Sequence, residues 1–356
     1  MRIAQVPPLY EAVPPRLYGG TERVVASLTE ARVELGHEVT LFATGEAESP
    51  AEIVVVRDRA IRLDEYPLKS DLAAHLVMLH EVRRRAAEFD IIHFHVDLLH
   101  LPLFEAIAHR TVTTFHGRLD LKDLSEALAC WPRYGYVSIS DHQRLPLRGV
   151  RWVGTVHHGL PPRIFDRAGA GDGGYLAFLG RISPEKRPDR AIRVAREAGV
   201  PIKLAAKVDA SDKAYFDAHI RHLLDAPGVE FIGEIGDHEK LAFLANARAL
   251  LFPIDWPEPF GLVLIEAIAC GTPVIAWNRG SVPEIVDHGV TGFIVNSVEE
   301  AVDAVGRLAE LDRLAVRRVF ERRFTAATMA GNYLRLYQGL LSASDPMDTE
   351  LSGAVA

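Results

Sequence analysis

The chain has 356 residues, more than a single hydrophobic core usually supports, so two domains are expected. Its composition of 48% hydrophobic and 25% charged residues is ordinary for a globular protein, and its net charge of −8 argues against a nucleic-acid binder held by bulk electrostatics. Two cysteines are too few for a disulfide framework. No apolar run has the length of a transmembrane helix or the form of a signal peptide, so we expect a cytoplasmic protein with at most peripheral membrane contact.

Strands and helices alternate through the first half of the chain. Apolar runs typical of buried strands recur, at 2–6, 37–43, 90–95, 111–116 and 136–140. Helical patterns lie between them, at 21–35 and 70–88. This alternation predicts a mostly parallel sheet with helices on both faces.

A glycine-rich stretch interrupts the alternation at 168–174, where four of the residues are glycines, and it is typical of a flexible joint. The pattern then restarts, with strands expected at 175–180, 202–206, 229–232 and 249–252 and helices at 189–198 and 239–246. The sequence therefore predicts two doubly wound α/β domains, residues 1–168 and 169–324, that bind ligands at the carboxyl ends of their strands. Residues 343–356 are small and polar and are expected to be disordered.

The most informative segment is bracketed by two glutamates and reads Glu-Pro-Phe-Gly-Leu-Val-Leu-Ile-Glu from Glu258 to Glu266. Glu258 is expected in the loop before a helix and Glu266 within that helix, less than two turns on. Both carboxylates can therefore face one pocket, beside the free amides of the helix start. Carboxylates there accept hydrogen bonds from hydroxyl groups, and the amides suit an anion. The alternative is a helix that carries two solvated glutamates.

This segment resembles the E-x7-E signature of the retaining, nucleotide-sugar-dependent glycosyltransferases of family 4. The resemblance implies the GT-B fold, in which two Rossmann-like domains face a central cleft and a C-terminal helix, here about 325–341, crosses back onto the first domain. It implies that Glu266 takes the ribose hydroxyls of the donor. It also implies that Glu258 holds the sugar hydroxyls together with three backbone amides, those of Phe260, Gly261 and Leu262.

Two further motifs resemble the same family. Gly19 and Gly20 precede a helix whose first amides suit an anion, and in the family a Gly-Gly loop here contacts the donor diphosphate. Arg181 and Lys186 follow the first strand of the second domain, and the resemblance assigns them to the leaving diphosphate. The structural alternatives are a common Gly-Gly helix start and a solvated basic turn, in which Ser183 would cap the next helix.

Three histidines are expected near strand ends, at His93, His95 and His116. His93 and His95 with Asp97 can be read as metal ligands, but a hydrogen-bonded position in the core or cleft wall is favoured, because helices should cover both faces of the sheet. His116 resembles the first-domain histidine that contacts the transferred sugar in relatives. His158 departs from the Asn-Gly that is more common there, and no role is assigned to it.

Glu284 ends the segment Arg279-Gly-Ser-Val-Pro-Glu284, which resembles the Gly-Gly-x-x-Glu region beside the donor site of the family. Ser281 and Glu284 equally match a capping box, so a purely structural helix start is an alternative.

The chain contains neither a metal-holding Asp-x-Asp tripeptide nor a Cys/His set with zinc spacing. We therefore predict a metal-independent retaining glycosyltransferase without a cofactor, whose donor is UDP-glucose or a similar nucleotide diphosphate sugar. The acceptor, whether a sugar, a lipid-linked or a small molecule, is not identified by the sequence. Two alternatives stay open: a UDP-sugar epimerase of the same fold, and a non-catalytic protein that binds nucleotide sugars.

Overall fold

The computed structural model describes residues 1–16, 19–66, 70–165, 171 and 173–344. The chain forms two compact units: unit 1 combines Met1–Gly159 with the segment that begins at Ala326, and unit 2 is Leu160–Thr325. The division therefore falls earlier than the expected boundary at 168–174, most of which lies outside the described residues. Of the expected tail at 343–356, residues 343 and 344 still belong to a helix and the others lie outside the described residues.

The described residues of unit 1 build a seven-stranded parallel sheet in the order β3-β2-β1-β4-β5-β6-β7. Its strands are β1 (Arg2–Val6), β2 (Glu38–Thr44), β3 (Glu52–Arg57), β4 (Ile91–Phe94), β5 (Thr111–Thr114), β6 (Gly135–Ser138) and β7 (Trp152–Thr155). The sequence did not predict β3 and β7. Both lie at the edges of the sheet and are only half-buried, so they lack the continuous apolar run of the central strands.

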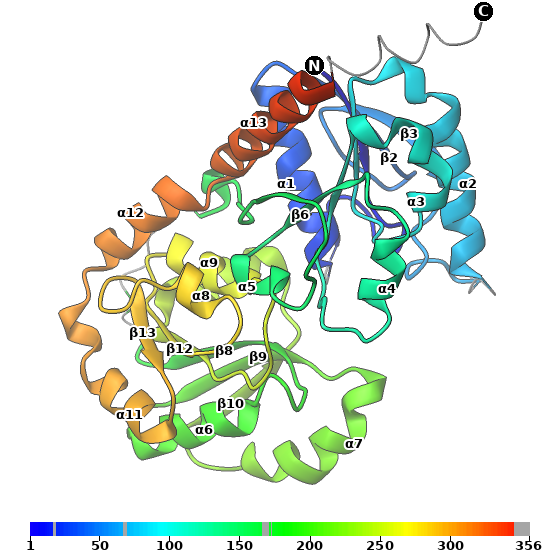
Figure 1. Ribbon diagram of the computed structural model, residues 1–356. Helices are drawn as coiled ribbons and strands as arrows, with labels where there is room; N and C mark the ends of the chain where they lie inside the picture. Colours follow the sequence, from blue (N-terminus) through cyan, green and yellow to red (C-terminus); the bar gives the residue numbers. More distant parts are fainter. Residues whose placement is uncertain (17–18, 67–69, 166–170, 172, 345–356) are drawn as a thin grey trace, which may run out of the picture. The chain divides into compact units, whose positions relative to one another are not determined.

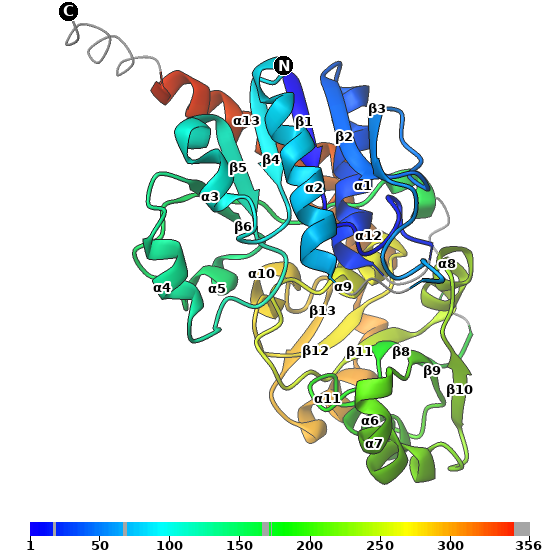
Figure 2. The same cartoon turned by 90° about the vertical axis from the view of Figure 1, so that its right-hand side faces the viewer.

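Helices cover both faces of this sheet (Figure 1). The first helix, α1 (Gly20–Glu34), packs against α13 (Ala326–Ser344), which returns to unit 1 after the chain has completed unit 2. On the opposite face, α2 (Asp71–Arg84) packs against β3 and against α3 (Leu101–Phe104), as the rotated view shows (Figure 2). Two short helices complete the unit, α4 (Leu124–Ala129) and α5 (Asp141–Arg144).

The described residues of unit 2 build a six-stranded parallel sheet in the order β10-β9-β8-β11-β12-β13. Its strands are β8 (Leu176–Arg181), β9 (Ile202–Lys207), β10 (Val229–Gly233), β11 (Ala249–Phe252), β12 (Val274–Trp277) and β13 (Gly292–Val295). One face is covered by α6 (Pro188–Glu197) and α11 (Val298–Gly306), and the other by α8 (Asp237–Asn246), α9 (Leu262–Ala269) and α12 (Arg313–Arg323). The shorter helices are α7 (Lys213–Tyr215) and α10 (Val282–Ile285).

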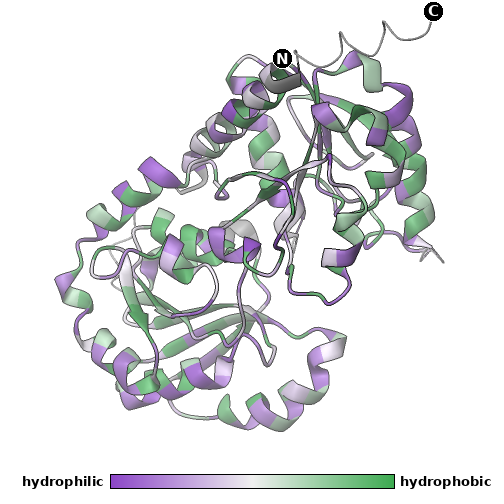
Figure 3. Ribbon diagram, viewed as in Figure 1, coloured by the Kyte–Doolittle hydropathy of each residue, from purple (hydrophilic) through white to green (hydrophobic). Residues whose placement is uncertain are grey.

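Each unit has its own hydrophobic core, built from strand residues and the inner faces of the helices. Helices such as α11 accordingly alternate between hydrophobic and hydrophilic stretches (Figure 3). In both sheets the strand order reverses once, between β1 and β4 and between β8 and β11. Open parallel sheets bind ligands at the carboxyl edge beside such a reversal, so these two edges are the expected ligand-binding edges of the units.

Candidate functional site

The carboxyl ends of β8 and β11 diverge in unit 2. β8 pairs with β9 along its whole length, from Leu176 to Arg181, but it pairs with β11 only at its first two residues. The chain beyond each strand therefore has room to turn over the edge of the sheet. Arg181 is the last residue of β8, Lys186 lies in the turn that follows, and Glu258 lies in the loop after β11.

Lys186 and Glu258 form an ion pair that joins these two loops. The turn is fixed by the carbonyl of Ser183, which accepts the backbone N–H groups of Lys186 at 3.2 Å and Arg187 at 3.3 Å. The Lys186 ammonium also lies 4.9 Å from the ring centroid of Trp256. Both charged side chains are largely shielded from solvent, with 22% of Lys186 and 11% of Glu258 exposed.

The helix predicted at 189–198 is confirmed as α6, but the suggested cap at Ser183 was wrong. The helix α6 begins at Pro188, which occupies its first turn, after Arg187 in a left-handed conformation with φ of 52°. Because a proline pre-sets the helical φ and needs no N–H partner, Pro188 is the better first residue. Lys186 therefore lies in a turn before the helix, where its ammonium reaches Glu258.

Arg181 lies among three carboxylates. Its guanidinium is 2.6 Å from Glu185, 3.2 Å from Asp212 and 3.7 Å from Asp209. Sequence reasoning missed these partners: Glu185 is four residues beyond Arg181, and the two aspartates follow the neighbouring strand β9. The signal available in the sequence was that the two aspartates follow β9, which lies beside β8 in the sheet. The guanidinium is thus oriented, and largely neutralised, by groups that an anion would have to displace.

The loop that carries Glu258 leads directly into α9. Gly261 takes the N-cap position of α9 with φ of 82°, a conformation that favours glycine, and Leu262 is its first helical residue. Phe260 is 2% exposed and packs edge-on against Phe324. The predicted loop and helix positions of Glu258 and Glu266 are confirmed.

Ser281 and Gly280 pack under this loop. The alternative of a capping box at Ser281 and Glu284 was wrong: Ser281 is the N-cap residue of α10, but its hydroxyl donates to the Phe260 carbonyl at 2.8 Å and accepts no hydrogen bond from the α10 backbone. A β-carbon on Gly280 would lie 2.3 Å from the carbonyl oxygen of Glu258. The segment after β12 therefore packs against the backbone of Glu258 and Phe260 and holds it in place. The sequence did not predict this contact.

Glu266 pairs with a different lysine, Lys240 of α8, at 2.9 Å. Only 7% of the Glu266 side chain and 16% of the Lys240 side chain is exposed. The carboxyl edge of this sheet thus holds two buried carboxylates, each oriented by a lysine, together with the guanidinium of Arg181. Carboxylate oxygens accept hydrogen bonds from hydroxyl groups and the cations attract oxyanions, so the edge can hold a ligand that carries both.

The other predicted residues lie in unit 1. Gly20 opens α1 and Gly19 is its N-cap, where a β-carbon would lie 2.7 Å from Pro15 and 3.2 Å from the carboxylate of Glu22. Glu22 is buried in the first turn of α1, and burial raises its pKa. A glycine is therefore required at position 19 by close packing of the preceding loop, whereas Gly20 is exposed.

His116 follows β5 and belongs to a group of buried imidazoles. Its Nε2 is 2.8 Å from Nδ1 of His95, and its ring stacks on that of His158 with a centroid distance of 5.2 Å. Burial lowers the pKa of His116 to about 3, so the ring is neutral at physiological pH. The prediction for His93 is confirmed: it is fully buried and bonded to Thr114 at 2.7 Å and Tyr337 at 2.7 Å.

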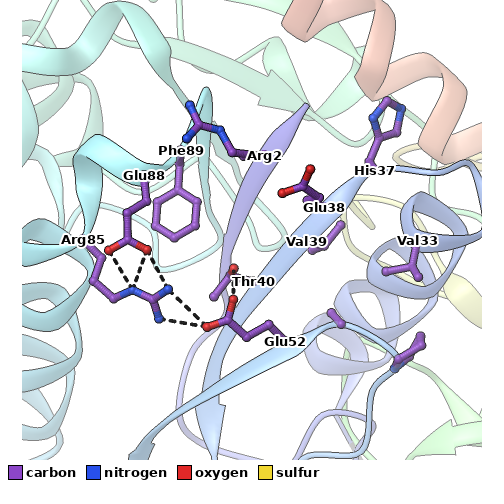
Figure 4. Close-up of a pocket in the computed structure, with 12 residues that line it drawn as sticks. Arg2, Val33, His37, Glu38, Val39, Thr40, Glu52, Arg85, Glu88 and Phe89 are labelled. Carbon is purple, nitrogen blue, oxygen red and sulfur yellow. Dashed lines mark hydrogen bonds and ion pairs between the residues drawn. The ribbon is translucent and has the colours of Figure 1, made fainter.

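Unit 1 also contains a cavity of about 510 Å³ that none of the predicted residues lines. It lies at the amino-terminal ends of β1, β2 and β3, the edge opposite to His116 (Figure 4). Its Arg85 is paired with Glu52 at 3.1 Å and with Glu88 at 2.7 Å. The charge of Arg85 is thus compensated within the lining, and the predicted site residues lie at the other end of the strands.

Among residues 1–16, 19–66, 70–165, 171 and 173–344, no group of three or more His, Cys, Asp or Glu side chains is arranged to hold a metal ion. None of the helices in the same part of the chain combines the length and apolar character needed to cross a membrane.

Two families of known proteins match the chain in succession. The family described as Glycosyltransferase Family 4 matches residues 18–139, and the family described as Glycosyl transferases group 1 matches residues 163–321. Among curated proteins, the D-inositol 3-phosphate glycosyltransferases of Mycobacterium tuberculosis and Mycobacterium bovis are 36% identical over 190 residues. That match covers 49% of this chain and 38% of each relative, so the chain spans well under two thirds of their length.

Solved structures share the whole architecture. AviGT4, a glycosyltransferase involved in avilamycin A biosynthesis, is 26% identical with a TM-score of 0.70, over 97% of this chain and 99% of its own. The sucrose-phosphate synthase of Thermosynechococcus elongatus is 18% identical with a TM-score of 0.75, over 97% and 100%. HepE of Anabaena, solved with UDP and glucose, is 18% identical with a TM-score of 0.69, over 95% and 100%. These likenesses confirm the predicted GT-B fold of two Rossmann-like units.

Proposed function

The chain belongs to the family 4 glycosyltransferases, and we propose that it transfers a hexosyl group from a nucleotide diphosphate sugar to an acceptor hydroxyl with retention of configuration. The observation that carries this proposal is the set of buried ion pairs at the carboxyl edge of the unit 2 sheet, Lys186 with Glu258 and Lys240 with Glu266. A UDP-hexose is the first choice of donor, because relatives of the same fold have been solved with UDP, and with UDP and glucose.

In this proposal the two glutamates bind different parts of the donor. Glu266 accepts hydrogen bonds from the ribose hydroxyls, and its ion pair with Lys240 orients the carboxylate for that purpose. Glu258 accepts from the hydroxyls of the hexosyl group, assisted by the backbone amides at the start of α9, those of Phe260, Gly261 and Leu262.

Arg181 and Lys186 attract the diphosphate between the two sugars. In the structure their cationic groups are held by Glu185 and Glu258, so we expect donor binding to exchange carboxylate for phosphate oxygens. The negative charge on the diphosphate grows as the glycosidic bond breaks. Attraction to the two cations therefore strengthens toward the transition state and lowers the barrier.

The chemical step is proposed to run on one face of the sugar ring. The acceptor oxygen bonds to the anomeric carbon on the face from which the diphosphate departs, and the departing diphosphate takes the proton of the acceptor hydroxyl. This order keeps the configuration at the anomeric carbon and needs no pair of carboxylates of the hydrolase type. Because Arg181 and Lys186 supply positive charge to the leaving group, transfer is proposed to need neither a divalent metal nor a cofactor.

The acceptor is proposed to bind to unit 1, at the carboxyl edge of its sheet. Gly19 and Gly20 open α1 at that edge, and His116 follows β5. His116 itself is proposed to contact the transferred sugar, as the resemblance implies, because its neutral imidazole suits a hydroxyl group rather than an anion. The identity of the acceptor is left to the experiment.

The test is incubation of the purified protein with UDP-glucose and other UDP-hexoses in excess EDTA, with and without a panel of sugar, lipid-linked and small-molecule acceptors. We expect an α-linked product, read by NMR, and its loss in Lys186→Met. Lys203→Met is the matched control, since that exposed lysine pairs with Glu230 away from the site. A β-linked product would refute retention. Conversion of the donor sugar without an acceptor would indicate an epimerase, and nucleotide binding without turnover a non-catalytic binding protein.

A further inference from the structure

Two aromatic rings flank the ammonium group of Lys186. Its Nζ lies 4.9 Å from the ring centroid of Trp256 and 5.5 Å from that of Phe252. Phe252 is the last residue of β11 and is buried, whereas Trp256 lies in the loop that follows and is half-buried. A cation within about 6 Å of a ring centroid is attracted to the face of the ring. The two rings therefore hold the charge of Lys186 at the carboxyl edge of the unit 2 sheet.

Main-chain hydrogen bonds fix the place of the Trp256 ring. The N–H group of Asp255 donates to the carbonyl of Glu185 at 2.8 Å, which joins the loop after β11 to the turn after β8. The next residues along the two segments are Trp256 and Lys186, which are thereby brought side by side. The N–H group of Glu258 donates to the Trp256 carbonyl at 2.9 Å, and this tight turn brings the Glu258 carboxylate to the same ammonium. The ring and the carboxylate thus reach Lys186 from one short loop.

The other cation of the proposed diphosphate site is held in a different way. Three carboxylates surround the Arg181 guanidinium, at 2.6 to 3.7 Å. Lys186 instead pairs with Glu258, the residue that the proposed function assigns to the hydroxyls of the hexosyl group. When Glu258 turns to the sugar, Lys186 loses this ion pair, and the two rings still hold it. Because a ring face attracts the cation without a carboxylate or carbonyl oxygen, the N–H groups of the lysine stay available to phosphate oxygens.

We propose that Trp256 and Phe252 are positioning residues, which keep the Lys186 ammonium directed at the diphosphate while Glu258 exchanges its ion pair for the sugar hydroxyls. This role rests on the proposed function, because it requires a diphosphate as the anion. Lysine has a flexible four-carbon stem, and holding it in advance reduces the entropy lost when the diphosphate binds. The rings make no contact with the donor in this proposal, so their effect passes through Lys186.

UDP is the probe for the first test, because it is the diphosphate that departs in the proposed reaction and its binding needs no acceptor. Trp256→Leu removes the ring and keeps an apolar side chain at a half-buried position. We expect the Kd of UDP, measured by calorimetry, to rise about tenfold, the scale of a partly shielded cation–π contact. Trp256→Phe keeps a ring face and should stay within about threefold of the wild type. An unchanged Kd in Trp256→Leu, or equal losses in the two variants, would overturn the role of the ring.

A double-mutant cycle shows whether the ring acts through Lys186. In a Lys186→Met background, Trp256→Leu should change the Kd of UDP by less than about twofold, because the cation that the ring holds is absent. A change of about tenfold in both backgrounds would mean that Trp256 contacts the nucleotide itself, and it would overturn the proposal. The matched control is Tyr175→Leu. The ring of Tyr175 lies 4.9 Å from the Lys203 ammonium at the amino-terminal ends of β8 and β9, so its loss should leave the Kd of UDP within about twofold.

NMR of the full-length protein with ¹³C-labelled lysine tests the ring arrangement without any ligand. The ring current shifts a methylene group over a ring face upfield, so we expect upfield ε-CH₂ protons for Lys186, assigned with Lys186→Met, that move downfield in Trp256→Leu. The signal of Lys203, beside Tyr175, should not move. Wild-type protein that binds UDP but lacks the Lys186 shift would refute the ring arrangement alone. Wild-type protein that shows the shift but does not bind UDP would refute the proposed function, and with it the diphosphate as the ligand of Lys186.

Discussion

Acidification should unfold unit 1 before unit 2, because unit 1 buries several histidines in the neutral form. Burial lowers the pKa of His100 and His116 to about 3, and it lowers the pKa of three others well below 6.5, namely His93, His95 and His158. In the unfolded chain each returns to a pKa near 6.5. Below that pH the unfolded state binds protons that the folded state does not, so stability is present above pH 6.5 and is lost as the pH falls toward 3.

The size of the effect follows from linkage. Between pH 7.5 and pH 5.5, each histidine that stays neutral in the folded state lowers the free energy of unfolding by about 1.4 kcal/mol. His100 and His116 together give about 3 kcal/mol, and the five together give about 7 kcal/mol. A domain is usually stable by only about 5–15 kcal/mol, so the loss is comparable to the whole stability of unit 1.

Hydrogen exchange read by mass spectrometry resolves the two units, after correction for the pH dependence of intrinsic amide exchange. Amides of β4 and β5 should lose protection at pH 5.5 relative to those of β11 and β12, because the buried polar residues in the described part of unit 2 include no histidine. His100→Phe keeps the aromatic stacking on Phe94 but cannot titrate, so it should reduce the pH dependence by about 1.4 kcal/mol. The matched control is His109→Gln, a change at an exposed position of the same unit. Equal loss of protection in both units, or none, would refute the reasoning.

Three further outcomes are expected. Arg181→Ala or Lys186→Ala should lower kcat by about a hundredfold or more, with a smaller change in donor KM, because their attraction grows as the diphosphate leaves; equal effects on both constants in steady-state kinetics would contradict this. Gly280→Ala should lower the stability of unit 2 in urea unfolding by about 1–3 kcal/mol more than the control Gly289→Ala. Both glycines have a positive φ, 57° and 77°, but only at Gly280 would the new β-carbon collide with backbone atoms. Tyr337→Phe should destabilise unit 1 by about 1–3 kcal/mol, because it removes the hydroxyl that accepts a hydrogen bond from the buried Arg32 guanidinium. Arg32→Met should destabilise unit 1 less, because it removes the buried charge as well. A larger loss of stability in Arg32→Met than in Tyr337→Phe, measured by thermal unfolding, would contradict this expectation.

Sequence periodicity determined the central strands and their order of appearance. A strand buried on both faces must be apolar along its whole length, so β1, β4 and β11 were predicted with nearly their observed bounds. The edge strands β3, β7 and β13 were not predicted; β3 and β7 are half-buried and do not need such a run, and β13 is only four residues long. The start of α6 was predicted within one residue, but its cap was not: Ser183 is a suitable residue type for a cap, whereas the structure forms a tight turn before Pro188.

The residue types at the site were likewise evident from spacing, because Glu258 and Glu266 flank a helix start and Arg181 ends a strand. What only the tertiary structure decided was the partner of each charge. Glu185 comes from the turn after β8, the two aspartates near Arg181 come from the segment after β9, and Lys240 comes from α8; they meet because parallel strands end at one edge. Spacing along the chain fixes which residues share a strand or a helix turn, and side-chain partners at long separation depend on how sheets and helices pack, which no local pattern encodes.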